Sequence, residues 1–300
     1  MEPTTYGLEV YRFQPRRAAV PGYLLVDVAA ECSEGRNERI EWGYSTVSCS
    51  DGVLEVSING AISVTLDSAE ARLLREDYMY MVTGKGLIPI EVRRPGAYMR
   101  LHNPRGLKTP TLIINGIHMH RIVGMDPVSD ARAKVAAARV KRGHVVLDVC
   151  TGLGYTAIAS LERGASRVYT IEVSREVLAL AELNPSSKRL ADRRAVIILG
   201  DASQVIGLLP DNSFDRVIHD PPRFNVAGEL YSSVFYREIY RVLKPGGVLF
   251  HYTGEPMKTR GHGRGPIVRG VVERLRAAGF TNIHFNDKAQ GVVARKPRSL

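Results

Sequence analysis

The sequence has few cysteines and lacks long apolar runs, and these absences exclude several protein classes. Cys32, Cys49 and Cys150 form no CxxC pair, so we expect neither a disulfide framework nor a metal site built from them alone. No stretch approaches the roughly 20 consecutive apolar residues that span a bilayer. The first residues lack the basic and then apolar order of a secretory signal or transit peptide. We therefore expect a cytoplasmic protein in a reducing compartment, with no membrane partner.

Positive charge is in excess. The chain has 41 lysines and arginines against 31 aspartates and glutamates, which gives a net charge of +10. Most of the basic residues are arginine, whose planar guanidinium suits phosphate and stacks on bases. An acidic partner such as RNA is one interpretation. A surface on which arginines form ion pairs with neighbouring acids is the other, and composition alone favours neither.

The first part of the chain is typical of a small β-rich domain. A chain of 300 residues favours two domains, because single cores stop growing at roughly 250 to 300 residues. Asn-Gly pairs at 59–60 and 115–116 are typical of tight hairpins. We expect a β-rich domain over 1–118 that assists substrate docking, with one helix near 68–77. The expected extended segments include 23–29, 53–58, 61–66 and 87–92.

After Asp126-Pro127, apolar strands alternate with amphipathic helices. This order predicts an α/β domain over 119–300 with a mostly parallel, doubly wound sheet. The expected strands are 145–148, 167–172, 195–199, 214–219, 247–252, 282–285 and 292–294. The expected helices are 128–142, 155–163, 175–183, 232–243 and 267–278.

A glycine-rich loop follows the first of these strands. In Asp148-Val-Cys-Thr-Gly152-Leu-Gly154, glycine lets the chain turn sharply and lets a ligand approach the backbone, so the loop predicts a nucleotide-like ligand. Glu172 ends the next strand, where a carboxylate can bond both ribose hydroxyls. Asp201 follows the third strand and is placed for an adenine amino group. An NAD site is less favoured, because residue 157 is alanine where GxGxxG has its third glycine.

This set of residues resembles class I S-adenosylmethionine-dependent methyltransferases, from about Val145 to Lys296. The resemblance implies a seven-stranded sheet and S-adenosylmethionine as cofactor. It further implies that Asp148 and Gly152 contact the methionine end of the cofactor, Glu172 the ribose and Asp201 the adenine. The resemblance also includes Thr151, Gly154 and Ala202 among the cofactor-binding residues.

A second motif, Asp220-Pro221-Pro222-Arg223-Phe224, follows the fourth strand. An exocyclic amine on a conjugated ring is a poor nucleophile because its lone pair is delocalised. A carboxylate and a carbonyl held by two prolines can bond both amine hydrogens and favour a pyramidal nitrogen. Asp220 and Pro221 are the expected catalytic groups.

The motif resembles the Asp/Asn-Pro-Pro-aromatic motif of amino-group methyltransferases, with its aromatic residue one place late. We assign base stacking to Phe224 and count it as catalytic, while Arg223 is a candidate for binding substrate phosphate. Together with residues 150–155, the run 218–224 further resembles a group of predicted archaeal methyltransferases. Arg260 and Arg264, in a basic glycine-rich loop after the fifth strand, are further candidates for substrate binding.

The favoured function is methylation of an exocyclic amine of a base in structured ribosomal or transfer RNA. One alternative is a polyamine aminopropyltransferase, which uses decarboxylated S-adenosylmethionine. Its Gly-Gly-x-Asp-Gly loop is absent here, and a chain of charge +10 would repel a polycation unless the pocket were locally acidic. Protein methylation is a further alternative.

Overall fold

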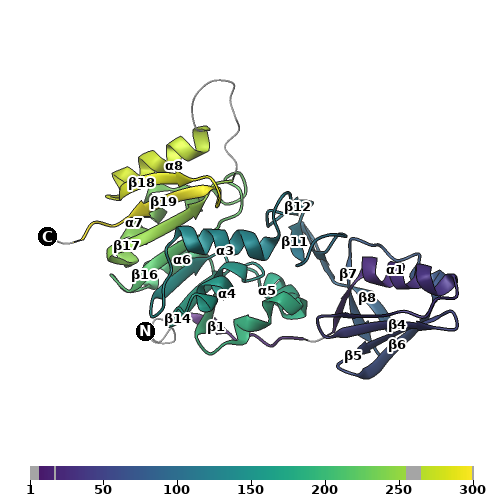
Figure 1. The fold of residues 1–300 in the computed structure, drawn as a ribbon. Coiled ribbons are helices and arrows are strands. Elements are labelled where there is room, and N and C mark those ends of the chain that lie inside the picture. The colour runs from purple at the N-terminus through teal and green to yellow at the C-terminus, as the bar shows by residue number, and fades with distance from the viewer. Residues whose placement is uncertain (1–6, 17, 255–264, 299–300) are drawn as a thin grey trace. The chain divides into compact units, whose positions relative to one another are not determined.

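The computed structural model describes residues 7–16, 18–254 and 265–298 (Figure 1). The chain divides into two compact units, each considered by itself. The large unit comprises the described residues of Met1–Phe13, Val128–Arg175 and Leu190–Leu300. The small unit comprises the described residues of Gln14–Pro127 and Glu176–Arg189. No helix among the described residues is both long enough and apolar enough to cross a membrane.

The large unit is built on an eight-stranded sheet within the described residues, in the order β1-β15-β14-β13-β16-β17-β19-β18. The strands are β1 (Glu9–Tyr11), β13 (Val145–Val149), β14 (Arg167–Glu172), β15 (Ala195–Leu199), β16 (Phe214–His219), β17 (Leu243–Tyr252), β18 (Thr281–Asn286) and β19 (Gly291–Arg295). Strands β13 to β17 pair in parallel, whereas β19 is antiparallel to both its neighbours. The expected doubly wound, mostly parallel sheet with seven strands is confirmed, and β1 adds an antiparallel eighth at the edge.

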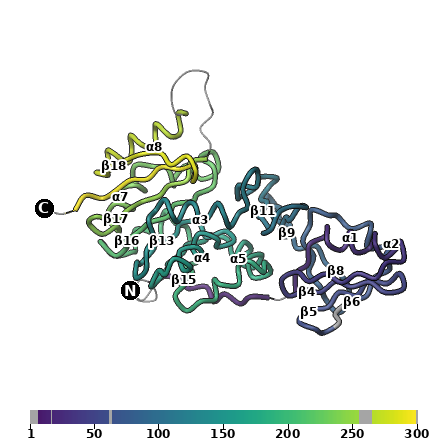
Figure 2. The backbone as a smooth tube through the Cα atoms, in the orientation of Figure 1, coloured from purple at the N-terminus to yellow at the C-terminus, as the bar shows by residue number. Residues whose placement is uncertain are grey.

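Helices cover the sheet because its central strands are apolar on both faces. α6, α7 and α8 pack one against the next, and α8 packs against β18 and β19. Figure 2 shows α8 beside β18. α4 packs against β13 and β14. The α-helices outside the N-terminal part are α3 (Pro127–Ala137), α4 (Tyr155–Glu162), α5 (Arg175–Leu183), α6 (Ala202–Leu208), α7 (Ser233–Val242) and α8 (Pro266–Ala277). Two 3₁₀ segments are η2 (Pro185–Ala191) and η3 (Gly228–Tyr231).

The small unit contains three antiparallel sheets within the described residues, ordered β2-β7-β8, β3-β4-β5-β6 and β12-β11-β10-β9. Their strands are β2 (Ala19–Pro21), β3 (Arg39–Trp42), β4 (Ser45–Ser50), β5 (Val53–Ile58), β6 (Ala61–Asp67), β7 (Met79–Thr83), β8 (Gly86–Pro89), β9 (Glu91–Arg94), β10 (Ala97–His102), β11 (Thr111–Ile114) and β12 (Ile117–His118). Both expected Asn-Gly hairpins form, and Asn59 and Asn115 have positive φ angles of 51° and 49°. The expectation of a β-rich region is confirmed.

The expected extended segment 23–29 is wrong. It lies within helix α1 (Gly22–Ser33), whose apolar side chains Leu25, Val28 and Cys32 recur at helical spacing and are buried. The helix packs against β4 and β5, and this packing overrides the strand preference of its valine and tyrosine residues. The helix expected near 68–77 is shorter, as α2 (Ser68–Ala71).

The expectation that the cysteines form no disulfide is also wrong. Cys32 of α1 and Cys49 of β4 form a disulfide, with their Cα atoms 5.7 Å apart. They are 17 residues apart in sequence and belong to no motif, so only the packing of the helix on the sheet brings them together. The cytoplasmic location stays a prediction.

Removal of this disulfide is expected to destabilise the small unit. A closed loop of this length restricts the unfolded chain, so the variant Cys32→Ala/Cys49→Ala should lose about 2–4 kcal/mol of unfolding free energy. Denaturant unfolding with and without a thiol reductant measures the effect. The reductant should destabilise the wild-type chain and leave the double variant unchanged. Equal sensitivity of the two proteins would contradict the prediction.

Candidate functional site

The loop after β13 has the backbone conformation that the glycine pattern predicts. Cys150, Gly152 and Gly154 have positive φ angles of 70°, 53° and 76°. Glycine adopts these angles without strain, whereas Cys150 adopts one despite its side chain. A Cβ atom at Gly154 would also collide with the Leu190 side chain. The loop therefore requires glycine at residue 154 for two separate reasons.

Asp148 lies beneath this loop and is fully buried. Its Oδ2 accepts a hydrogen bond of 2.8 Å from the Thr170 hydroxyl, and the Thr151 and Thr170 hydroxyl oxygens are 2.6 Å apart. Oδ1 has no hydrogen-bond partner among the described residues. Burial raises the pKa of Asp148 to about 7, although hydroxyls of Thr156 and Thr170 oppose the shift. A buried carboxylate oxygen thus lies beside the loop, able to accept a bond from a cationic ligand.

Glu172 ends β14 and is held by the backbone. Its Oε2 accepts from the Gly152 amide at 2.9 Å and its Oε1 from the Ser174 amide at 3.0 Å. Burial raises the pKa of Glu172, and these amide bonds act in the opposite direction. Glu172, the predicted ligand of the ribose, is therefore held by hydrogen bonds. One of them comes from the loop that is predicted to bind the methionine end of the cofactor.

Asp201 follows β15 and caps helix α6. Its Oδ1 accepts from the Ser203 amide at 2.8 Å and the Ser203 hydroxyl at 2.7 Å. The sequence did not predict this capping role. Ala202 is the first residue of α6 and is buried. The N-terminus of α6 thus lies next to Asp201, the predicted ligand of the adenine.

Four carboxylates from separate strands converge around the glycine-rich loop. Burial and the charges of Glu172, Asp220, Asp148 and Asp201, in that order, raise the pKa of the Cys150 thiol well above its ordinary value. Because β15, β14, β13 and β16 are neighbours, their carboxyl ends meet at one edge. The structure therefore brings the predicted cofactor ligands together with the predicted catalytic aspartate.

Asp220 is paired with a lysine that the sequence did not single out. Lys134 of α3 donates from Nζ to Asp220 Oδ1 at 2.8 Å and Oδ2 at 2.7 Å. The same Nζ is 3.0 Å from Asp130 Oδ2 and 4.0 Å from the centre of the Tyr252 ring. The side chains of Lys134, Asp130 and Asp220 are only 4%, 2% and 17% exposed. The carboxylate is thus fixed in orientation by a buried ammonium group.

Lys134 and Asp220 act on each other's pKa in opposite directions. Burial lowers the pKa of Lys134, but the charges of Asp220 and Asp130 outweigh burial and raise it above its ordinary value. Burial raises the pKa of Asp220, and Lys134 opposes that shift. In the sequence, the only sign that Lys134 is paired is that Asp130 lies four residues before it. The same spacing is also usual for exposed ion pairs on helices.

The rest of the second motif reaches the surface. Pro221 is buried, whereas Arg223 is exposed and the Phe224 side chain is 48% exposed. Phe224 contacts the Tyr231 ring edge-on at 5.4 Å, and the Tyr231 hydroxyl donates to the Pro222 carbonyl at 2.9 Å. An aromatic ring is therefore exposed four residues after Asp220. The predicted substrate residues Arg260 and Arg264 lie outside the described residues.

His219, which precedes Asp220, has partners in the core. Its Nε2 is 3.0 Å from the Leu230 carbonyl oxygen, and its ring stacks on His251 at 4.4 Å. Burial lowers the pKa of His219 to about 4. The ring is neutral and structural, which agrees with the more common role of a histidine at a strand end.

A family model described as a methyltransferase domain matches residues 146–247. Residues 146–247 therefore form a class I methyltransferase domain. Its cofactor is S-adenosylmethionine. The archaeal group that the motifs resemble stays a prediction.

Curated relatives of the methyltransferase domain differ in how close they are. An uncharacterized protein of Methanocaldococcus jannaschii is 54% identical over 190 residues, which cover 63% of this chain and 65% of that protein. Ribosomal RNA large subunit methyltransferase I of Citrobacter koseri is 23% identical over 176 residues, covering 56% of this chain and 44% of that protein. The chain thus spans less than two thirds of the length of either relative.

A solved structure also shares the fold. Spermidine synthase from Thermotoga maritima aligns with a TM-score of 0.54 and 17% identity, covering 70% of this chain and 72% of that chain. At this identity the likeness concerns the fold alone.

The carboxyl edge of the methyltransferase domain fits this cofactor. S-adenosylmethionine carries a cationic ammonium and sulfonium, a ribose diol and an adenine amine. The open Asp148 oxygen, the fixed Glu172 carboxylate and Asp201 supply acceptors from three adjacent strands. The fit thus rests on acceptors that the chain itself presents in a buried setting.

Proposed function

We propose that the methyltransferase domain methylates an exocyclic amine of a base in structured RNA. The observation that carries this proposal is the position of Asp220 at the end of β16, next to the glycine-rich loop, with both carboxyl oxygens bonded to Lys134. The Asp220 amide donates to the Val149 carbonyl at 3.3 Å, so the carboxylate lies one strand away from Asp148. It is an acceptor positioned beside the methyl donor's site.

Asp220 would act as an acceptor for the amine hydrogens. A bond from the amine to its carboxylate favours the pyramidal nitrogen, whose lone pair is available for attack. Lys134 fixes the two oxygens, so little reorganisation is needed at the moment of transfer. Bound S-adenosylmethionine supplies the electrophilic methyl group. The nitrogen becomes acidic on methylation, and its proton can leave to the Asp220 carboxylate or to water.

The proposal of RNA as substrate rests on charge, on a relative and on an exposed aromatic ring. The net charge of +10 favours a polyanion, and the Citrobacter koseri relative is by its name a ribosomal RNA methyltransferase. The half-exposed Phe224 ring offers a stacking surface near Asp220. The assay is methyl transfer from labelled S-adenosylmethionine to ribosomal and transfer RNA from a strain without the gene. Mass spectrometry of the digested RNA then identifies the base.

Aminopropyl transfer to a polyamine is a second candidate, because the catalytic edge is locally acidic. Carboxylates surround Cys150, and Lys134 is itself neutralised by two aspartates. The repulsion expected from the net charge is therefore reduced at the site. Incubation with decarboxylated S-adenosylmethionine and putrescine tests this candidate. Release of methylthioadenosine without RNA would favour it over RNA methylation.

Cofactor binding is expected to depend on pH through Asp148, which we propose as the ligand of the cofactor ammonium. Only the ionised carboxylate attracts this cation, and the pKa of Asp148 is about 7 in the unliganded chain. The dissociation constant should therefore rise about tenfold for each pH unit below the pKa. Calorimetric titrations on both sides of the pKa measure this slope. Asp148→Asn should bind weakly with no such slope, and an equal slope in this variant would contradict the assignment.

A further inference from the structure

The amino edge of the large sheet, opposite the catalytic edge, carries a concentration of cations. We name this surface the basic edge. Its members are Arg139, Lys141, Arg142, Arg163, Arg167, Arg193, Arg216, Arg295 and Arg298. The register places them together, since Arg167 is level with Val145, and both Arg216 and Arg295 pair with Val248. Positive charge from six segments therefore gathers on one side of one unit.

Backbone carbonyls fix several of these guanidinium groups. Arg163 Nε donates to the Val140 carbonyl at 2.9 Å, and Arg216 Nε donates to that of Arg139 at 3.1 Å. Arg167 Nη1 donates to the Arg193 carbonyl at 3.0 Å. A guanidinium has five N–H donors, so one carbonyl bond orients the group and leaves donors for a ligand. Such fixed arginines lose less conformational entropy when they bind phosphate.

The acids near this edge are already paired. Asp192, Asp211 and Asp215 form ion pairs with Arg194, Arg241 and Lys244 respectively. No ion pair of a basic-edge residue is found in the part of the chain that the structure describes. By contrast, many arginines of the small unit have carboxylate partners.

The cations of the basic edge affect one another. Burial lowers the pKa of Arg216, and the charges of Arg295 and Arg139 lower it further against the opposing effect of Asp215. Burial also lowers the pKa of His144, and Arg216 adds to that shift. Positive charge on this edge is therefore not cancelled by the fold. An anionic partner would stabilise it.

We propose that the basic edge binds the phosphate backbone of the RNA whose base enters the catalytic edge. This inference rests on the proposed RNA substrate. Strands of five or six residues separate the two edges by about 17–20 Å. A folded RNA can span that distance, whereas a free nucleoside or a polyamine cannot. The basic edge would thus select a structured acceptor.

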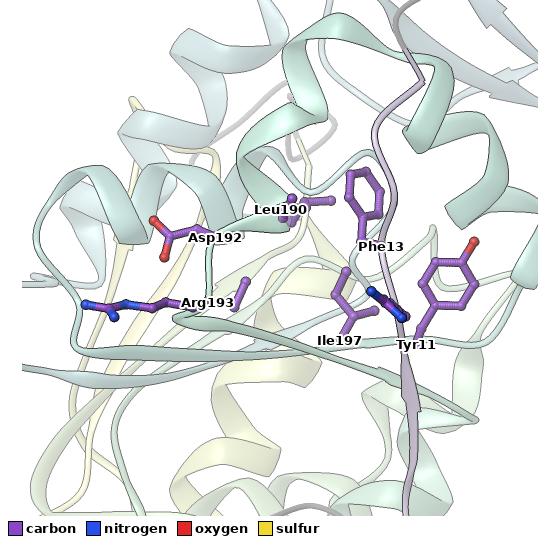
Figure 3. A pocket seen from close by; sticks show the side chains of 9 residues that line it. Tyr11, Phe13, Leu190, Asp192, Arg193 and Ile197 are labelled. Carbon is purple, nitrogen blue, oxygen red and sulfur yellow. The ribbon is translucent and has the colours of Figure 1, made fainter.

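The basic edge ends at a pocket between β1 and the segment that precedes β15 (Figure 3). Tyr11, Phe13, Leu190 and Ile197 line it, together with Arg193 of the basic edge. Because β1 runs antiparallel to β15, Phe13 lies toward the amino end of that strand. The surface is therefore hollowed beside the edge strand β1. The RNA would thus contact a surface that is complementary in shape as well as in charge.

The test compares two triple variants that remove equal charge from exposed arginines. The first, Arg139→Gln/Arg142→Gln/Arg193→Gln, removes cations of the basic edge and leaves the backbone carbonyls in place. The matched control removes three ion-paired arginines of the small unit, by the changes Arg36→Gln, Arg39→Gln and Arg93→Gln. Binding of labelled transfer RNA and ribosomal RNA fragments by the full chain is measured against salt concentration.

The basic-edge variant should bind RNA about tenfold to a hundredfold more weakly, with a salt slope reduced by about 2 to 3, because each lost phosphate contact contributes about 0.7–0.9. Its affinity for S-adenosylmethionine should be unchanged. The control variant should lose much less RNA affinity and slope than the basic-edge variant, because its three guanidinium groups are already paired with carboxylates.

Three outcomes would overturn the inference. Equal RNA affinity in the two triple variants would show that this edge is not the contact, while methylation by the wild type would leave the proposed function standing. Failure of the wild-type chain to bind any RNA would remove both proposals. An acidic protein retained by the wild type and lost by the basic-edge variant, with unchanged RNA affinity, would assign the edge to a protein partner.

Discussion

Replacing Asp220 by alanine is expected to lower the rate of methyl transfer by about 10²–10³-fold while S-adenosylmethionine still binds. The reason is that the acceptor amine loses the carboxylate that favours its nucleophilic form. The predicted cofactor ligands Asp148, Glu172 and Asp201 lie on other strands or directly after one, and they are unchanged. Single-turnover transfer from labelled cofactor measures the rate, and calorimetry measures the cofactor affinity.

The Asp220→Ala variant also leaves Lys134 short of one partner, and an unpaired buried charge can cost about 3–5 kcal/mol of stability. Asp220→Asn is therefore the companion variant, because its amide keeps an acceptor oxygen and nearly the same volume. It should fold and show a smaller loss of transfer than alanine. Turnover at the wild-type rate in both folded variants would refute the role of Asp220.

The cofactor half of the site could be predicted because its determinants are local. A glycine with positive φ is required wherever a strand turns sharply into a helix, so Gly152 and Gly154 are visible in the sequence. Glu172 is singled out by its position at a strand end, and its role as a ribose ligand stays a prediction. The alternation of strands and helices fixed the parallel sheet for the same reason.

The features that were not predicted depend on contacts distant in sequence. β1 joins the large sheet because Val10 pairs with Ile198, although the domain boundary was expected at 118–119. Residues 176–189 likewise belong to the small unit, and no local sequence pattern predicts that this segment packs there. The Cys32–Cys49 disulfide was missed because a seven-residue window at 23–29 is too short to separate a buried helix from a strand.

Lys134 was missed for a related reason. The sequence of α3 is rich in alanine and basic residues, which predicts an exposed helix. Only the docking of α3 at the ends of β16 and β17 buries the Lys134 ammonium. The sequence thus predicts which carboxylate is available for catalysis. It does not show the group that sets the orientation and charge of that carboxylate.

Replacing Lys134 by methionine is expected to reduce transfer and move its acidic limit to higher pH. Burial raises the pKa of Asp220 and Lys134 lowers it, so loss of Lys134 raises that pKa further. Because the ionised form of Asp220 accepts the amine hydrogens, activity should be lost at a pH where the wild type is still active. The maximal rate should fall by about 10²-fold at neutral pH, with little change in cofactor affinity.

Conservative variants separate this positioning role from a purely structural one. Lys134→Arg retains a cation beside Asp220 and should restore the wild-type acidic limit even where its geometry gives only part of the rate. Asp130→Asn leaves the Lys134–Asp220 pair and removes a negative charge that raises the pKa of Asp220, so its acidic limit should not move to higher pH. Thermal unfolding controls for the cost of burying unpaired charge. A Lys134→Met enzyme that is less stable but keeps the wild-type pH profile would assign Lys134 to folding alone, because a group that only supports the fold has no reason to move the titration of Asp220.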